Sequence, residues 1–379
     1  MASKRPSQSN PAETIGGIDD LLTLIFLFLP ARPLIRFQLV CKRWRSLISD
    51  ERFSHLHSRL HRRLRTRNRL SFILRASLPE FYYFNHVART FRQISIGFDY
   101  PKILQSCNGL LLMECRNTPF GWKKYYVCNP TNKNIRCLAY DNKKKDVISG
   151  MCLAFDPLKS PHYKVVCVKG KEDSIFEYVL EVYDSRNHAW SSFGAPFTAL
   201  PNTQFCNGIY MNDGIYWIKP RAKSCFLDLE KGSVETLPTI KFPRRKAGES
   251  HKNFVIESNG HIHCVSLYLH AKMKSVYVFE LFEDNSCWVE TFRAELNLIS
   301  AAFPEMSDAE VNVLSIVRGD MELDAVLLLH FNNKIVSYRF WDGEFGLVFD
   351  LRTRGFARQH LLQFDRNHVF QVVESMAPV

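Results

Sequence analysis

A run of nine almost wholly apolar residues, Leu21 to Leu29, constrains the fold of this 379-residue chain more than any other feature. It lies between the acidic pair Asp19-Asp20 and Pro30. A membrane-spanning helix needs about 20 apolar residues, so this run is too short to cross a bilayer. A helix that is apolar on every side must instead be covered by protein on every side. The adjoining residues can cover only part of it, and the remaining apolar surface predicts a site for a partner protein.

The residues after this run have helical spacing. Pro33 can occupy the first turn of a second helix. Six apolar residues then recur at intervals of three and four, which is typical of one buried helical face: Leu34, Phe37, Val40, Cys41, Trp44 and Ile48. Ser49 is a favoured N-cap residue, and Asp50 and Glu51 follow in the first turn of a third helix. We therefore predict three short helices within residues 16–60.

The order of residues in this region, DDLL followed by LPARPLIRFQLVCKRWRSLISDERF, closely resembles the F-box. Receptors of ubiquitin ligases use this module to bind a Skp-family adaptor. The resemblance implies that the matching apolar positions contact the adaptor: Leu21, Leu22, Ile25, Leu29, Pro30, Leu34, Val40, Cys41 and Trp44. Gly17-Ile18 stands where most F-boxes have Leu-Pro, and Leu24 replaces an acidic residue. The periodicity alone is also compatible with a three-helix cap that packs only on the rest of the chain.

The composition is that of a folded intracellular protein. Hydrophobic residues make up 46% of the chain and charged residues 23%, and the length favours two domains. Residues 1–15 are polar and contain prolines, which predicts a disordered tail rather than a signal peptide. The 11 cysteines are scattered without C-x-x-C spacing. This usage favours reduced thiols and a location in the cytoplasm, the nucleus or both.

The positive charge is concentrated directly after the predicted helices. The net charge is +12, and residues 1–75, with 15 Lys plus Arg and 5 Asp plus Glu, contribute +10 of it. We interpret residues 61–70 as a basic linker or helix within a cluster of six arginines: Arg59, Arg62, Arg63, Arg65, Arg67 and Arg69. A solvated surface, an acidic protein partner and nucleic acid all stay open as explanations. Nucleic acid is the weakest, because no zinc-finger, basic-zipper or RNA-binding signature accompanies the arginines.

From residue 71 onward, short runs rich in Val, Ile, Tyr and Phe alternate with Gly, Asn, Asp and Pro, which is typical of an all-β domain. Five hairpins share one order of strand, polar turn and strand. Their turn residues are spaced 55, 44, 56 and 58 apart: Asn129, Asp184, Asp228, Asp284 and Asp342. Asn-Gly or Asp-Gly pairs at 108–109, 213–214 and 259–260 introduce further strands, and a short helix is expected only around residues 304–312. Such repeats favour a kelch-type β-propeller, with a twisted β-sandwich as the alternative.

The same region resembles the F-box-associated domain of plant F-box proteins. The matching segments spread over nearly all of residues 71–379, among them ILQSCNGLLL, YYVCNPTNKNIRCL and HVFQVVES. The resemblance of both parts implies a multidomain α plus all-β chain that serves as the substrate receptor of an SCF-type ubiquitin ligase. A Skp-family adaptor would link the F-box to cullin and RING subunits, while the β domain binds a target protein. Such a receptor acts by positioning and needs no catalytic residue of its own.

Residues with chemistry of their own form no recognisable site in the sequence. The candidates are Cys107 beside Asn108, the 261–264 segment His-Ile-His-Cys, and Asp156. In a strand, His261 and His263 point to one face and Cys264 to the other, so the three cannot easily share a metal ion. We therefore expect no catalytic residue, no metal, no cofactor and no membrane segment. The alternatives are a non-ligase F-box protein or a nucleic-acid-associated protein that uses residues 59–69.

The target-binding residues stay unknown at this point. Four aromatic side chains can serve either as anchors for a target or as packing residues between strands: Phe120, Trp122, Trp217 and Trp341. Sequence alone does not distinguish the two roles, because aromatic residues are enriched both at interface centres and in β-sheet cores.

Overall fold

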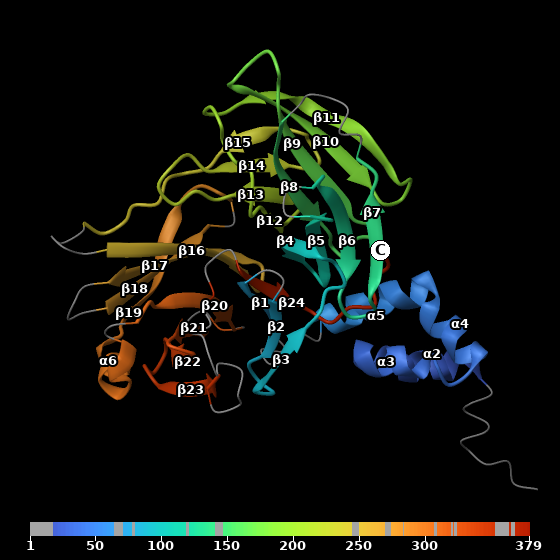
Figure 1. The fold of residues 1–379 in the computed structure, drawn as a ribbon, viewed down its shortest axis with the longest axis horizontal. Coiled ribbons are helices and arrows are strands. Elements are labelled where there is room, and N and C mark those ends of the chain that lie inside the picture. Colours follow the sequence, from blue (N-terminus) through green and yellow to red (C-terminus); the bar gives the residue numbers. More distant parts are fainter. Residues whose placement is uncertain are drawn as a thin grey trace, which may run out of the picture.

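The computed structural model describes residues 18–63, 71–77, 80–118, 121–140, 147–244, 250–269, 274–282, 284–306, 309–319, 321, 324–352, 364 and 368–379. Within these residues, a group of four helices precedes six antiparallel sheets of four strands each. The sheets are arranged like blades around a common centre (Figure 1). The β region is therefore a six-bladed propeller, which confirms the predicted propeller and excludes the sandwich. The predicted tail, 1–15, lies outside the described residues, as does most of the predicted basic linker.

The helical domain consists of α2 (Asp19–Leu27), α3 (Ala31–Phe37), α4 (Lys42–Ser49) and α5 (Glu51–Arg63). The predicted second helix is thus divided in two, and four helices are present where three were expected. Cys41 takes an extended conformation and restarts the helix as an N-cap, because its Sγ accepts the backbone N–H of Trp44 at 3.4 Å. Asp50, and not Ser49, caps α5: its Oδ1 accepts the N–H of Phe53 at 3.1 Å.

One small core holds the four helices together. Leu22 and Phe26 from α2 pack there with Met376 from the C-terminal end of the chain. The other three helices contribute Ala31, Leu34, Ile48 and Phe53. The ring of Trp44 packs against that of Phe26 with centroids 5.0 Å apart. The helical domain therefore does not complete its core alone, because the propeller chain contributes one side chain to it.

Five blades follow one another along the chain, each built from four consecutive strands. They are β4 (Tyr100–Cys107), β5 (Leu110–Arg116), β6 (Lys124–Asn129), β7 (Asn134–Leu138); β8 (Val147–Ala154), β9 (Lys164–Gly170), β10 (Glu177–Asp184), β11 (Ala189–Thr198); β12 (Ile209–Met211), β13 (Gly214–Trp217), β14 (Cys225–Asp228), β15 (Val234–Thr236); β16 (Ser250–Ser258), β17 (His261–Leu269), β18 (Lys274–Leu281), β19 (Trp288–Glu295); and β20 (Asn312–Arg318), β21 (Ala325–Phe331), β22 (Lys334–Arg339), β23 (Phe345–Asp350). We number these blades 2 to 6.

The remaining sheet, blade 1, joins the two ends of the propeller chain. It contains β1 (Ser71–Ser77), β2 (Glu80–Asn85) and β3 (Thr90–Ile94), and its innermost strand is β24 (Val369–Val372). Strand β24 pairs antiparallel with β1 from Ser71↔Val372 to Leu74↔Val369. Apolar residues of blade 1 pack on blade 6 on one side and on blade 2 on the other. The ring is therefore closed by hydrogen bonds between segments about 300 residues apart.

The five hairpins predicted from sequence are confirmed as the third and fourth strands of blades 2 to 6. Each turn residue uses its side-chain oxygen in the same way. Its Oδ1 accepts the backbone N–H two residues ahead at 2.8 to 3.0 Å, an Asx turn: Asn129, Asp184, Asp228, Asp284 and Asp342. The sequence repeat is thus a repeat of one local hydrogen bond that reverses the chain.

The helix expected around residues 304–312 lies slightly earlier in the chain. Helix α6 covers Asn297–Ala302, and a single 3₁₀ turn, Pro304–Met306, follows it. Strand β20 begins at Asn312. Proline has a fixed φ and no N–H, so it favours the first turn of a helix. In this segment Pro304 begins only the 3₁₀ turn, because the preceding residues already form the helix.

Candidate functional site

Helix α2 is apolar on two faces, and only one of them is covered. Leu22 and Phe26 are 5% and 2% exposed and lie in the helical core. On the other face, four side chains at spacings i, i+3, i+4 and i+7 are 40 to 66% exposed: Leu21, Leu24, Ile25 and Phe28. We call these four residues the outer stripe. An apolar stripe of this length on a surface helix is typical of a protein-binding site.

A second exposed apolar segment connects α3 with α4. Leu39 is 86% exposed and Val40 is 61% exposed, and Cys41 beside them is exposed as well. The described propeller therefore leaves the side chains of Leu39 and Val40 mostly exposed, whereas its Met376 packs in the helical core. We refer to Leu39–Cys41 as the α3–α4 turn. Together with the outer stripe, it leaves large apolar side chains of the short helical domain exposed.

The structure places the nine predicted adaptor-contact residues in three different environments. Five are exposed: Leu21, Ile25, Pro30, Val40 and Cys41. Leu29 and Trp44 are partly buried, while Leu22 and Leu34 are buried in the helical core. Leu22 and Leu34 therefore support the fold of the F-box in this structure, and contact of the nine residues with an adaptor stays a prediction. Helical periodicity groups apolar residues into faces, but it does not say which face turns toward the rest of the chain.

Sequence reasoning missed three exposed residues: Leu24, Phe28 and Leu39. Leu24 and Phe28 were detectable, because they stand three and seven residues after Leu21 and so share its side of the helix. Leu39 was not, since nothing local showed that the helix breaks before Cys41. The break places Leu39 and Val40 in a turn, where their side chains extend into solvent.

The C-terminal segment, residues 374–379, fastens the helical domain to blade 2. Asn129, at the end of β6, donates both Nδ2 hydrogens, to the carbonyls of Ser375 and Ala377, each at 2.9 Å. Ser375 also contacts Ser58 of α5, with Oγ atoms 3.3 Å apart. Gly109 has φ +96°, and a Cβ there would lie 2.5 Å from Cβ of Ser375. The segment is therefore packed too closely for any residue but glycine at that turn.

Two histidines of α5 bind the last carbonyls of the apolar run. Nε2 of His57 donates to the carbonyl of Leu29 at 2.8 Å, and Nε2 of His61 lies 2.9 Å from the carbonyl of Leu27. The last turn of a helix leaves its carbonyls without intrahelical partners, which applies to Leu27 at the end of α2, while Leu29 lies two residues beyond that end. Burial lowers the pKa of His57 to about 4, although the hydrogen bond to the carbonyl of Leu29 raises this pKa.

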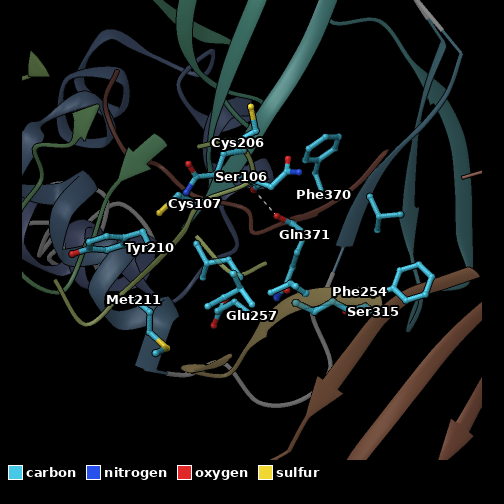
Figure 2. Close-up of a pocket in the computed structure, with 18 of the residues that line it drawn as sticks. Ser106, Cys107, Cys206, Tyr210, Met211, Phe254, Glu257, Ser315, Phe370 and Gln371 are labelled. Carbon is cyan, nitrogen blue, oxygen red and sulfur yellow. Dashed lines mark hydrogen bonds between the residues drawn. The ribbon is translucent and has the colours of Figure 1, made fainter. Parts of the chain in front are cut away.

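A cavity of about 620 Å³ lies at the centre of the ring. The inner strands of several blades line it, including β4, β16, β20 and β24, and Figure 2 shows side chains from them pointing toward the same space. Its wall combines aromatic, hydroxyl, amide and thiol groups: Ser106, Cys206, Tyr210, Phe254, Ser315 and Gln371. Ser106 Oγ donates to the carbonyl of Gln371 at 2.5 Å, which joins β4 to the closing strand β24.

The candidate reactive residues are used in packing. Cys107 Sγ lies 3.4 Å from the carbonyl of Phe155, and Asn108 Nδ2 donates to that same carbonyl at 2.6 Å. Asp156 accepts the backbone N–H of Leu158 at 2.9 Å and so shapes the β8–β9 loop. These contacts fasten the inner edge of blade 2 to blade 3.

The histidines of β17 point as the strand alternation predicts. His261 Nδ1 lies 2.7 Å and His263 Nε2 lies 3.2 Å from the carboxylate of Glu280, while Cys264 is buried on the other face. Burial opposes ionisation of Glu280, but the two histidines hold its pKa well below the usual range. Arg318 Nη1 also approaches this carboxylate, at 3.8 Å. Across the described residues, no group of three or more His, Cys, Asp or Glu side chains is arranged to hold a metal ion.

The four aromatic residues and the arginine cluster singled out in the sequence lie in different environments. Trp217 is 2% exposed, and its Nε1 donates to the carbonyl of Phe205 at 3.0 Å, so it is a packing residue. Trp122 and Trp341 are exposed, and Phe120 lies outside the described residues. Of the arginine cluster, Arg59 is partly buried on α5, and Arg62 and Arg63 are the last two residues of that helix. The other three arginines lie outside the described residues: Arg65, Arg67 and Arg69.

None of the helices in the described part of the chain is both long enough and apolar enough to span a membrane.

Two family models match the chain. One, described as F-box domain, matches residues 19–56, and the other, described as F-box associated beta propeller domain, matches residues 87–320. F-box protein At5g07610 of Arabidopsis thaliana is 28% identical, over 98% of this chain and 94% of that relative. F-box protein At3g17710 of the same plant is 26% identical, over 60% of this chain and 63% of that relative. Among solved structures, TolB from Acinetobacter baumannii superposes with a TM-score of 0.40 at 10% identity, covering 78% of this chain and 69% of that one.

Proposed function

Because the chain belongs to the F-box proteins that carry an F-box-associated β-propeller domain, we propose that it is the substrate receptor of an SCF-type ubiquitin ligase. In this role the F-box binds a Skp-family adaptor, the adaptor connects to cullin and RING subunits, and the propeller binds the target protein. The receptor contributes no catalytic group. It raises the effective concentration of the target near the conjugating enzyme, to the millimolar range for short connections.

The exposed apolar residues of the F-box are the observation that carries this proposal. The outer stripe and the α3–α4 turn expose large apolar side chains on one small domain, while the other apolar face of α2 already packs in the core that Met376 joins. Burying one such side chain contributes about 1.5 to 3 kcal/mol. Several of them together exceed a typical cost of association, which makes a stable complex with an adaptor feasible.

The double variant Phe28→Ala, Leu39→Ala tests the adaptor contact. Both side chains are more than 60% exposed, so their truncation leaves the F-box core intact. We expect affinity for a purified Skp-family adaptor, measured by isothermal titration, to fall by about 100-fold, which corresponds to about 2.8 kcal/mol. The matched control is Val147→Ala, Leu200→Ala, two side chains of similar exposure on the propeller. Equal affinity of wild type and the Phe28/Leu39 variant would show that the adaptor does not bind this surface.

A second measurement separates a ligase receptor from an F-box protein with another role. We expect a cullin subunit to co-purify with the wild-type chain through the adaptor, and the Phe28/Leu39 variant to lose both subunits together. Recovery of the adaptor without any cullin would favour the non-ligase role instead. The proposed location is the cytoplasm, the nucleus or both, and the eleven free thiols support a reducing compartment.

A further inference from the structure

The acidic and the basic residues that line the central cavity lie at opposite ends of it. One end faces the F-box. There Gly109 approaches Ser375, His162 of the β8–β9 loop approaches Glu51 of α5 at 3.9 Å, and Lys159 of the same loop pairs with Asp213. The cavity residues near these turns include two acidic residues, Asp156 and Glu257. We call this the F-box end and the opposite one the far end.

The far end of the cavity carries two cations. Strand β13 runs away from the turn that contains Asp213, so the following β13–β14 turn lies at the far end. Five residues of that turn line the cavity, namely 218 to 222, and they include Lys219 and Arg221. No acidic residue from this end is among the described residues that line the cavity. The far end of the cavity therefore presents positive charge on the side away from the F-box.

Lys219 differs from three other buried or partly buried lysines of the propeller. Lys169, Lys252 and Lys334 each pair with a glutamate. Lys219 is half-buried, yet its Nζ lies 5.3 Å above the ring centroid of Phe205 and forms no ion pair with a described carboxylate. Burial lowers its pKa. Removing a cation from water without a counter-charge is unfavourable, so this position favours an anion supplied from outside the chain.

The remaining wall suits a polypeptide beside that anion. Arg221 is exposed, and its guanidinium lies 5.3 Å over the ring of Phe242, while no carboxylate of the described residues forms an ion pair with it. In the same cavity, Tyr210 provides an aromatic ring and Gln371 provides an amide (Figure 2). The volume of about 620 Å³ lies within the range of ligand pockets, roughly 300 to 1,000 Å³.

We infer that the central cavity is the target-binding site, and that Lys219 and Arg221 bind the acidic side chains of a short segment of the target protein. This inference rests on the proposed receptor function and adds to it the site and the chemistry that the site selects. Attraction between these cations and carboxylates gives specificity for acidic segments and depends on ionic strength. Residues next to the acidic ones then enter the aromatic and amide part of the cavity.

Capture of peptides from a random hexapeptide pool on the immobilised full-length chain tests this inference. Sequencing of the captured peptides by mass spectrometry is expected to show enrichment of Asp and Glu on the wild type. In the Lys219→Gln, Arg221→Gln variant we expect this enrichment to fall by about tenfold, because both cations are lost. Lys223→Gln is the matched control, since Lys223 lies in the same turn, is exposed and does not line the cavity. An enrichment that is absent in the wild type, or equal in wild type and double variant, overturns the inference.

Two further measurements distinguish the outcomes. Titration with inorganic phosphate that releases heat only when Lys219 is present, without enrichment of acidic peptides, would assign a free anion to the site and overturn the peptide assignment. Adaptor affinity is measured on the same variants and should equal that of the wild type. If the adaptor fails to bind the wild type while acidic peptides are still captured, the receptor proposal fails and the cavity assignment stands. The reverse result overturns the cavity assignment alone.

Discussion

At the scale of single residues, the charge of His57 affects how firmly α5 holds α2. The pKa of this histidine is about 4 in the folded chain and about 6.5 when unfolded. Between these values only the unfolded state binds the proton, so stability is lost as pH falls from about 6.5 to about 4. The free energy of unfolding falls by about 3 kcal/mol over this range, because a pKa difference of one corresponds to about 1.4 kcal/mol. Hydrogen exchange in α2, corrected for intrinsic rates, should therefore accelerate at pH 5 relative to pH 7.

Two variants isolate this effect. His57→Gln keeps a donor for the carbonyl of Leu29 but does not titrate, so we expect it to remove the pH dependence of α2. His330, in blade 6, also has its pKa lowered to about 4 by burial, and neither ring nitrogen has a hydrogen-bond partner among the described residues. His330→Leu should flatten the pH dependence of β21 and leave α2 unchanged. If α2 in the His57→Gln variant still loosens at pH 5, another group is responsible.

Cys41 reports directly on the α3–α4 turn. Its thiol is exposed, as is that of Cys287 on the propeller, whereas burial raises the pKa of Cys128 and Cys264 to about 12. Thiolates are the reactive form, so iodoacetamide should modify Cys41 and Cys287 and leave the other two unmodified. We expect a bound Skp-family adaptor to slow modification of Cys41 about tenfold or more, since it covers this turn, and to leave Cys287 unaffected. Peptide mass spectrometry over time provides the measurement, and equal rates at Cys41 with and without adaptor would contradict the proposed surface.

At the scale of elements, the five Asx turns are alike in sequence, but one of them has a second function. Asp184 only reverses the chain, whereas Asn129 is fully buried and also donates to Ser375 and Ala377. Asn129→Asp keeps the turn acceptor, but it loses both donors and brings a carboxylate to two buried carbonyls. We expect this change to destabilise the chain by about 3 kcal/mol in urea unfolding, because unsatisfied buried groups cost about 1 to 3 kcal/mol each. Asp184→Asn, the matched control, should have almost no effect, and equal stability of the two variants would show that the contact with residues 374–379 is weak.

Local hydrogen bonds explain which elements the sequence predicted well. The hairpins of blades 2 to 6 were recognisable because each turn depends on a side chain two residues from the N–H that it binds. Blade 1 was missed as a unit, since its inner strand β24 comes from the other end of the chain. The break between α3 and α4 depends on a cysteine N-cap, which is a residue that N-cap preferences do not favour. The candidate site was predictable as an apolar helix, but its outward face depends on how the helices pack together, in a core that also includes the distant Met376.

At the scale of the whole molecule, the C-terminal segment connects the F-box with the strand that closes the propeller. Strand β24 closes the ring next to the cavity, and residues 374–379 continue from it into the F-box core. Arg32 of α3 pairs with Glu374 at 2.8 Å, and Asn129 holds the segment on blade 2. An adaptor on the F-box and a target in the cavity would therefore be held at a fixed separation. A fixed geometry favours transfer to particular lysines of the target, because orientation contributes to the rate.

Met376 is the residue of this segment whose side chain enters the F-box core. Met376→Ala leaves a space among Leu22, Phe26 and Leu34, and we expect it to destabilise F-box packing by about 2 to 4 kcal/mol. Met376→Leu conserves the volume and should cost less than about 1.5 kcal/mol. Calorimetry of Met376→Ala should show a lower transition temperature for the helices, with the propeller transition unchanged.

A chain that ends at residue 373 tests the whole segment. Small-angle scattering of this chain should show a larger maximum dimension than that of the wild type. Because Val373 precedes every contact with the F-box core, the shortened chain keeps β24 and ring closure. A shortened chain with wild-type helix stability and scattering would mean that other contacts, such as Glu51 with His162, fix the F-box instead.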